Sequence, residues 1–162
     1  MRVPVRTKGD DDGVKVVARN RRAFHEYEVL DRIECGLVLV GTEVKSLRDG
    51  HANIEDAYAK VESGELWMIG SDIPEYAMGN RLNHKPKRPR KLLLHRREIA
   101  RFADKATQRG FTLVPLRMYF RDGRAKVELA VARGKKEYDK RESAKKQEAQ
   151  REIRRAMTDR NR

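Results

Sequence analysis

Apolar and polar residues alternate from Tyr27 to Leu39, with the apolar residues on odd positions and charged residues between them. A period of two is the pattern of a half-buried β-strand. The same alternation returns at 57–69 and at 114–131, and each of these segments is interrupted by a turn sequence, SG and RDGR respectively. The pattern therefore predicts one long strand followed by two antiparallel hairpins.

Two segments change to the helical period. In GTEVKSLRDG, Thr42 is expected to cap a short helix, Val44 and Leu47 share one face at i and i+3, and Gly50 ends it. From Leu92 to Gly110, apolar residues lie near one face of a second helix whose other face is basic. Five or six short strands with two or three inserted helices predict a mainly β fold, a closed β-barrel with OB-like topology.

The strand pattern ends near Arg133, and a strongly charged segment follows. Carboxylates and cations spaced at i and i+4 favour a helix there, but the apolar stripe is too thin to hold it against a core. We expect a basic C-terminal tail that is disordered alone and helical when bound. The predicted organisation is a flexible leader (1–13), a barrel (14–133) and the tail (134–162).

The charge balance points to a polyanionic partner. Lys and Arg number 38 against 25 Asp and Glu, which gives a formal net charge of +13. The longest aliphatic runs, LVLV and LLL, are too short to span a membrane, and the N-terminus has no secretory pattern. A single cysteine, Cys35, rules out an internal disulfide and suits a small buried side chain in a cytoplasmic protein.

The segment RNRRAFHEY, residues 19–27, combines cations, an amide and aromatic rings. This mixture is typical of RNA recognition, in which cations contact phosphates, polar groups read base edges and rings stack on bases. By residue type, Arg19, Arg21 and Arg22 are assigned to phosphates, Asn20 to a base edge, and His25 or Tyr27 to stacking. A solvated cationic segment with Tyr27 in the core fits the composition equally well.

Glu34 is a carboxylate in the strand of a basic protein, beside Gly36. It could accept hydrogen bonds from a guanine or cytosine edge, or it could simply face solvent. The later run NRLNHKPKRPRK is strongly basic, and its prolines stiffen an exposed loop that is suited to phosphates. Its cations are Arg81, Lys85, Lys87, Arg88, Arg90 and Lys91.

No organised catalytic site is visible in the sequence. His25 with Glu28 or Glu34 would allow a nuclease hypothesis, but no metal-binding, nucleophile or phosphate-loop motif accompanies them. A ribosomal structural protein would also be a small basic barrel with an extension. The interpretation that we favour is an RNA-binding adaptor without catalytic residues, metal or cofactor.

Nine short motifs occur in the order expected of a known family: ARNRRAFHEYEV, GTEVKSLRDG, GELWMIGSDIPEY, GN, NH, KLLLH, REI, TLVPL and GKKEYDKR. Over residues 14–157 the chain resembles the small protein B family, the SsrA-binding proteins. The resemblance implies an OB-like barrel that binds the tRNA-like domain of transfer-messenger RNA. It implies an adaptor, expected to be a monomer, that delivers this alanine-charged RNA with elongation factor Tu to stalled ribosomes for trans-translation.

The resemblance also assigns residues. The family's RNA-contacting positions correspond to Asn20, Tyr27, Glu34 and Leu93, with Lys45, Arg48 and Lys91 nearby as phosphate contacts. Its tail motif corresponds to Gly134, Lys135, Lys136, Tyr138, Asp139, Lys140 and Arg141, and the tail helix continues through Arg155 and Met157. Such a tail is implied to occupy the decoding centre and the empty messenger channel, with Tyr138 stacked on a base. The acidic Asp10 to Asp12 depart from the basic N-terminus common in the family.

Overall fold

The computed structural model describes residues 13–79, 81–108, 110–135 and 137–160. For residues 137–140, 142–143 and 160 it describes the backbone alone. The leader 1–12, with Asp10 to Asp12, and Lys136 in the tail motif lie outside the described residues.

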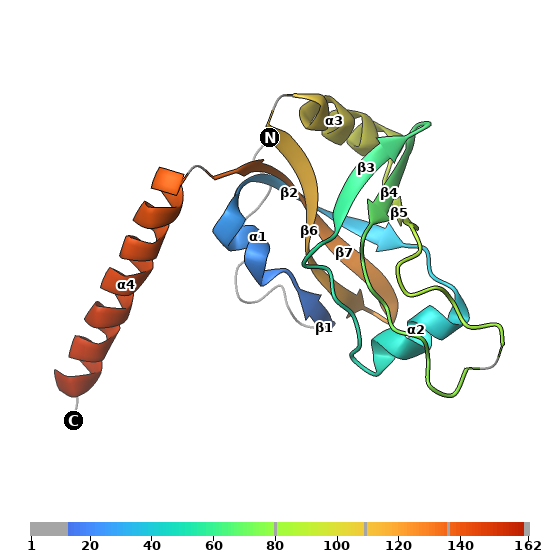
Figure 1. Cartoon of the computed structure of the whole chain (residues 1–162), viewed down its shortest axis with the longest axis horizontal. Helices are drawn as coiled ribbons and strands as arrows, with labels where there is room; N and C mark the ends of the chain where they lie inside the picture. Colours follow the sequence, from blue (N-terminus) through green and yellow to red (C-terminus); the bar gives the residue numbers. More distant parts are fainter. Residues whose placement is uncertain (1–12, 80, 109, 136, 161–162) are drawn as a thin grey trace.

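The described chain forms one antiparallel sheet whose strand order is β1-β6-β3-β4-β5-β2-β7. Strand β6 pairs with β7 as well, so the sheet closes into a barrel (Figure 1). The strands are β1 (Val14–Arg19), β2 (Tyr27–Leu37), β3 (Tyr58–Glu62), β4 (Glu65–Ile69), β5 (Arg90–Leu93), β6 (Phe111–Arg121) and β7 (Arg124–Gly134). The helices are α1 (Arg21–Glu26), α2 (Gly41–Arg48), α3 (Arg96–Thr107) and α4 (Glu137–Arg160). The predicted mainly β, OB-like barrel with inserted helices is confirmed.

Both predicted hairpins are present, and their turns explain why. Ser63 and Gly64 join β3 to β4 with φ of 53° and 75°, and Asp122 and Gly123 join β6 to β7 with φ of 51° and 77°. Two successive residues with positive φ match the right-handed twist of the flanking strands. Glycine adopts this region freely, and aspartate tolerates it better than most residues.

The helix expected from Leu92 begins later than the sequence suggested. Leu92 lies on β5, 1% exposed, and pairs with both Leu66 of β4 and Leu37 of β2. Helix α3 starts only at Arg96. The short strand β5 joins two other strands and so completes the ring of the barrel, which is why sheet pairing outweighs the local helical pattern here.

The apolar residues of β2 pack into two different hydrophobic clusters. The ladder to β7 shifts register between Val29 and Asp31, which is a β-bulge. Before the bulge, Tyr27 and Val29 pack on a small cluster under α1; after it, Ile33 and Cys35 belong to the barrel interior. The extra residue reverses the faces of the strand, so odd positions do not all point the same way.

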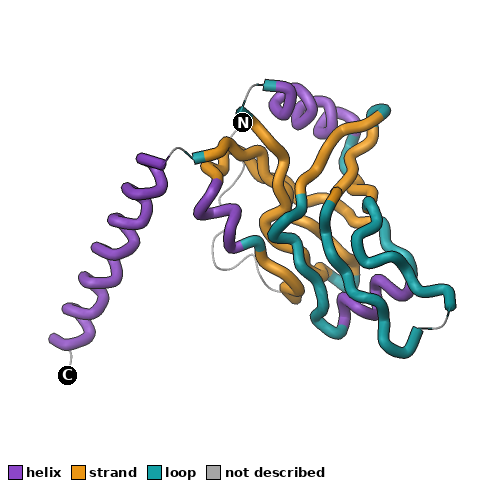
Figure 2. The backbone as a smooth tube through the Cα atoms, in the orientation of Figure 1, coloured by secondary structure: helices purple, strands orange, loops and turns teal. Residues whose placement is uncertain are grey.

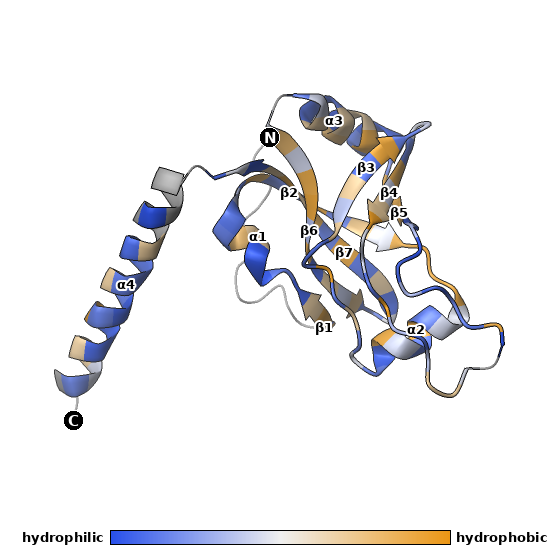
Figure 3. Cartoon of the chain, viewed as in Figure 1, coloured by the Kyte–Doolittle hydropathy of each residue, from blue (hydrophilic) through white to orange (hydrophobic). Residues whose placement is uncertain are grey.

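Helix α4 extends away from the barrel and is largely hydrophilic along its length (Figures 2 and 3). Its described side chains are exposed, including Ile153 and Met157. The sequence analysis expected the free tail to be disordered and the bound tail to be helical. The structure of the chain alone already contains the helix. Because almost no apolar area of α4 is buried, local i, i+4 pairs are what favour this helix. Its loss of order away from a partner stays a prediction.

Among the described residues, no helix combines the length and apolar composition needed to cross a membrane.

Candidate nucleic-acid interface

The side chain of Asn20 forms several hydrogen bonds at the junction between β1, α1 and β6. Its Oδ1 accepts a hydrogen bond from the Ala23 N–H at 3.1 Å, which caps α1. Its Nδ2 donates to the carbonyls of Pro115 at 2.9 Å and Ile54 at 3.3 Å. The side chain is 2% exposed. Asn20 therefore positions α1, and the contact of its amide with a base edge stays a prediction.

The neighbouring cations of α1 differ in their interaction partners. Arg22 bridges Glu26 at 3.3 Å and Asp56 at 3.1 Å, and so ties α1 to the loop before β3. Arg21 and His25 are exposed on the same helix. Among the predicted contacts in this segment, Arg21 and His25 therefore face solvent, while Arg22 is also exposed but is bridged to two carboxylates.

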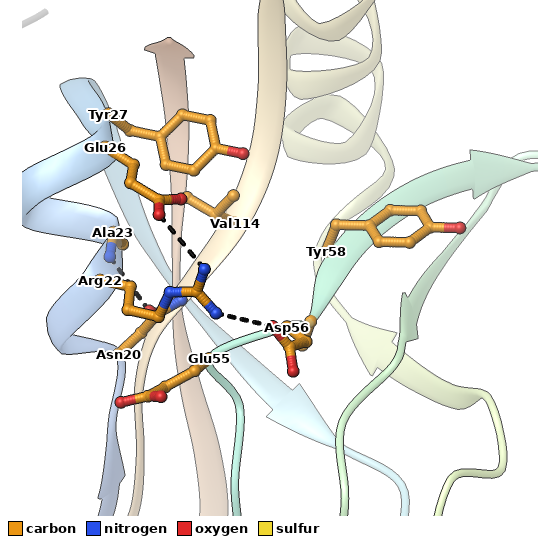
Figure 4. A pocket seen from close by; sticks show the side chains of 10 residues that line it. Asn20, Arg22, Ala23, Glu26, Tyr27, Glu55, Asp56, Tyr58 and Val114 are labelled. Carbon is orange, nitrogen blue, oxygen red and sulfur yellow. Dashed lines mark hydrogen bonds and ion pairs between the residues drawn. The ribbon is translucent and has the colours of Figure 1, made fainter. Parts of the chain in front are cut away.

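A cavity of about 180 Å³ opens between α1 and β3 (Figure 4). Its lining includes Tyr27, which is half-buried and packs on the small cluster, and Tyr58, which is 44% exposed on β3. The ring of Tyr27 thus contributes to the core, as one interpretation of the sequence expected, and its stacking on a base stays a prediction. The sequence analysis did not identify Tyr58 as a residue of this site. The available signal was its position on the polar face of the predicted hairpin.

Glu34 lies on the outer face of β2 within a polar network. Its Oε2 accepts hydrogen bonds from the Tyr119 hydroxyl at 2.6 Å and from Arg121 Nε at 3.1 Å. Arg117 stacks over the ring of Tyr119 at 4.7 Å and bonds Glu128 at 3.2 Å. About a quarter of the Glu34 side chain is exposed, at 24%. It is therefore neither an isolated acceptor nor a plain solvated residue, because it holds the buried Tyr119 hydroxyl and the partly exposed Arg121 in place.

Leu93 projects outward from β5, 52% exposed, directly opposite Gly36 of β2. A Cβ at Gly36 would lie 3.2 Å from the Leu93 Cβ, so glycine allows this close approach. Lys91, on the same face of β5, bonds Glu65 at 3.0 Å. Leu93 and Lys91 thus lie on a strand that pairs with the strand of Glu34.

Helix α2 presents Lys45 and Arg48 to solvent beside this barrel. Lys45 lies 5.7 Å from the centre of the Tyr76 ring, and the carbonyl of Arg48 accepts from Lys15 at 3.2 Å. The buried side of α2 carries Leu47, as the sequence predicted. Thr42 does not cap the helix; its hydroxyl bonds His84 instead.

A buried ion pair fixes α2 to the basic loop. Arg90 Nε donates to Glu43 Oε2 at 2.6 Å, Arg88 also bonds Glu43, and both Glu43 and Arg90 are 0% exposed. Burial would raise the pKa of Glu43, but hydrogen bonds from Arg88, the Val40 N–H and Arg90 outweigh it and hold that pKa below its ordinary value. Arg90 is therefore a structural residue, which corrects its assignment to the phosphate-binding run.

Hydrogen bonds of Asn83 and His84 fix the rest of that loop. The sequence analysis used these two residues only as the family motif NH. Asn83 exchanges two hydrogen bonds with the backbone of Tyr76, at 2.8 and 3.2 Å. The buried His84 donates from Nε2 to the Ile73 carbonyl at 2.8 Å, which leaves Nδ1 to accept from Thr42 at 2.9 Å. The exposed cations of the loop are Arg81, Lys85 and Lys87.

The base of the tail is attached to α1. The Lys135 N–H donates to the Glu26 carbonyl at 2.8 Å, and its Nζ donates to the Phe24 carbonyl at 3.0 Å. Further along α4, Arg141, Arg155 and Met157 are exposed. Of the remaining tail motif, Lys136 is outside the described residues, and the side chains of Tyr138, Asp139 and Lys140 are not described.

The described chain contains no group of three or more His, Cys, Asp or Glu side chains placed to bind a metal. Burial, reinforced by the charge of Glu98, raises the pKa of Cys35 to about 12, so this thiol stays protonated at neutral pH. Its predicted role as a small buried side chain is confirmed.

The fold and this surface define a class of protein, a small, strongly basic β-barrel with an appended charged helix. The profile of the SmpB protein family matches residues 17–159, and the chain belongs to that family. It is 58% identical over 142 residues to the SsrA-binding protein of Desulforudis audaxviator, covering 88% of this chain and 93% of that protein. It is 57% identical over 145 residues to the SsrA-binding protein of Thermobifida fusca, covering 90% and 91% respectively.

A solved structure points the same way. A chain from the work "tmRNA-SmpB: a journey to the center of the bacterial ribosome" is 45% identical, with a TM-score of 0.65. The match covers 82% of this chain and 94% of that one. The family resemblance inferred from sequence motifs is therefore confirmed, and it includes the fold.

Proposed function

We propose that this protein binds the tRNA-like domain of transfer-messenger RNA and delivers it to stalled ribosomes for trans-translation. The observation that carries the proposal is the nearly full-length match to SsrA-binding proteins. In this role the protein is an adaptor rather than an enzyme, and it acts in the cytoplasm as a monomer. Its partners are the RNA, the ribosome and elongation factor Tu with the alanine-charged RNA.

The geometry supports an RNA contact made by several separate groups. Exposed cations occur on α1 and α2, at Arg21, Lys45 and Arg48, and can meet phosphates. Leu93 and the Glu34 network provide apolar and polar contacts on the outer face of the barrel. Phosphate contacts fix position and orientation, whereas polar groups and rings read individual bases.

The tail has a separate role in this proposal. It occupies the decoding centre and the messenger channel, where its lysines and arginines face ribosomal RNA in place of a codon. The exposed Arg141 and Arg155 of α4 suit such a contact, because their side chains are accessible to ribosomal RNA. Its helical form is the one that we expect on the ribosome.

The affinity for a tRNA-like RNA should fall steeply with salt. Each cation that meets a phosphate releases a counterion, and about four such contacts would weaken binding about a hundredfold between roughly 50 and 200 mM salt. Filter binding or fluorescence anisotropy across a salt series measures the slope. A flat slope, or equal affinity for duplex DNA of the same length, would contradict the proposal.

The variant Glu34→Ala should weaken RNA binding about tenfold although it makes the protein more positive. The carboxylate holds Tyr119 and Arg121, so its loss disorders the outer face as well as removing an acceptor. The matched control is Glu28→Ala, which removes the same charge from the same strand at a half-exposed pair with Arg133. If both variants bind RNA equally well or more tightly than wild type, simple electrostatics explains the result and Glu34 has no specific role.

A further inference from the structure

The hydroxyl group of Tyr119 reaches Glu34 across a neighbouring strand. Tyr119 lies on β6 and pairs with Lys126 of β7, which in turn pairs with Gly36 of β2, two residues after Glu34. The tyrosine side chain therefore crosses the middle strand, and its hydroxyl donates to Glu34 Oε2 at 2.6 Å. This contact exists only because β6, β7 and β2 are neighbours in the closed sheet.

The Tyr119 ring is buried although it lies on the outer face of the barrel. Its neighbours along β6, Met118 and Phe120, belong to the barrel interior, so the alternation of the strand directs Tyr119 outward. It is nevertheless 0% exposed, and the guanidinium groups of Arg117 and Arg121 lie over its ring at 4.7 and 5.8 Å. A side chain enclosed in this way is held in one orientation, so its hydroxyl is a fixed donor.

Two donors act on the same oxygen of Glu34. Besides the Tyr119 hydroxyl, Arg121 Nε donates to Oε2 at 3.1 Å. The 2.6 Å distance lies in the range of charge-assisted bonds from a hydroxyl to a carboxylate, which are about twice as strong as neutral ones. Glu34 and Arg121 are each about a quarter exposed, whereas Tyr119 is fully buried. The carboxylate is therefore accessible from solvent, and the ring that orients it is not.

We propose that Tyr119 is a positioning residue for RNA recognition, which holds the Glu34 carboxylate in the orientation that accepts from a base. The inference rests on the proposed RNA-binding function and deepens it. A mobile glutamate loses rotamer freedom when it binds a partner, whereas a glutamate that is already held has lost this freedom on folding. Tyr119 thus raises the affinity for RNA by preorganising an acceptor, and its effect reaches the RNA only through Glu34.

The variant Tyr119→Phe removes the hydroxyl and keeps both the ring and the net charge. It should lower the affinity for the tRNA-like RNA about fivefold, measured by fluorescence anisotropy with the full chain. Because no charge changes, the slope of affinity against salt should equal that of wild type. Circular dichroism and urea denaturation check that the variant is folded.

The same substitution in the Glu34→Ala background is the matched control. If the hydroxyl acts through the carboxylate, Tyr119→Phe should leave the RNA affinity unchanged once Glu34 is absent, so the two substitutions are not additive. A purely structural role predicts the same loss of affinity in both backgrounds, and so does a direct contact between the hydroxyl and RNA. Equal losses in both backgrounds, or no loss in either, would overturn the proposal.

Proton NMR of the wild-type protein tests the bond without any substitution. The Tyr119 hydroxyl proton, assigned through its ring protons, should exchange slowly with water and stay visible when the tRNA-like RNA is bound. Its disappearance in the complex would mean that RNA binding breaks the bond, which contradicts a positioning role. If wild type binds this RNA and Tyr119→Phe binds it equally well, only the positioning role fails; if wild type does not bind it, the proposed function fails as well.

Discussion

A protein that ends at Gly134 should keep its folded barrel and its affinity for transfer-messenger RNA, yet fail to support tagging on stalled ribosomes. The cores of the barrel use residues up to Ala132, and the described side chains of α4 are exposed, so removing the tail costs the core almost nothing. The RNA would then reach the ribosome with nothing to occupy the decoding site. We expect tagging in a reconstituted translation system to drop to background.

The matched variant for this experiment replaces Asp139, Lys140 and Arg141 by alanine in the full-length chain. It should reproduce much of the tagging defect, because alanine cannot replace charge-assisted contacts to ribosomal RNA. Circular dichroism of the barrel and RNA affinity serve as controls for both proteins. Tagging at the wild-type rate by the truncated protein would show that the tail has no part in the mechanism.

The variant Glu43→Ala should lower the free energy of unfolding by about 3 to 5 kcal/mol. It leaves the guanidinium of Arg90 buried without its counter-charge, and removing one member of a buried ion pair costs far more than breaking an exposed one. Urea denaturation at neutral pH measures the loss. Arg133→Ala, which breaks the half-exposed pair with Glu28, is the control and should cost about 1 kcal/mol or less.

The pH dependence of stability provides an independent check on Glu43. Its pKa is lower in the folded protein than in the unfolded chain, so the unfolded carboxyl takes up a proton first as the pH falls. Its contribution to stability is complete above the ordinary pKa of glutamate and is lost as the pH falls through the lowered folded value. The Glu43→Ala variant should show a shallower loss of stability in this acidic range. Equal slopes for variant and wild type would mean that the ion pair contributes nothing.

Features decided by neighbouring residues could be predicted from the sequence. The two hairpins were correct because Ser63-Gly64 and Asp122-Gly123 specify tight turns between alternating segments. The end of α2 was correct for the same kind of reason, since Gly50 has a φ of 85°. Each of these depends on a few adjacent residues, and no distant partner is needed to recognise it.

Features decided by distant partners were missed. Arg90 and Lys91 are adjacent in a run of cations, yet only Arg90 is buried, because its partner Glu43 lies 47 positions earlier. The bulge in β2 depends on its pairing with β7, and the burial of Asn20 depends on carbonyls contributed by Pro115 and Ile54. In the candidate site, Tyr58 and Asp56 come next to Tyr27 only through the closure of the barrel.

The short helix α1 contacts both the cavity and the base of the tail, so a movement of α1 would also move the tail. Arg22 and Glu26 contribute to the cavity, while the carbonyls of Phe24 and Glu26 hold Lys135 just before α4 begins. Helix α4 spans 24 residues and is therefore a lever about 36 Å long. A tilt of about 10° transmitted to its base would carry its far end about 6 Å, roughly one helical turn. What binds beside α1 can thus set where the tail points.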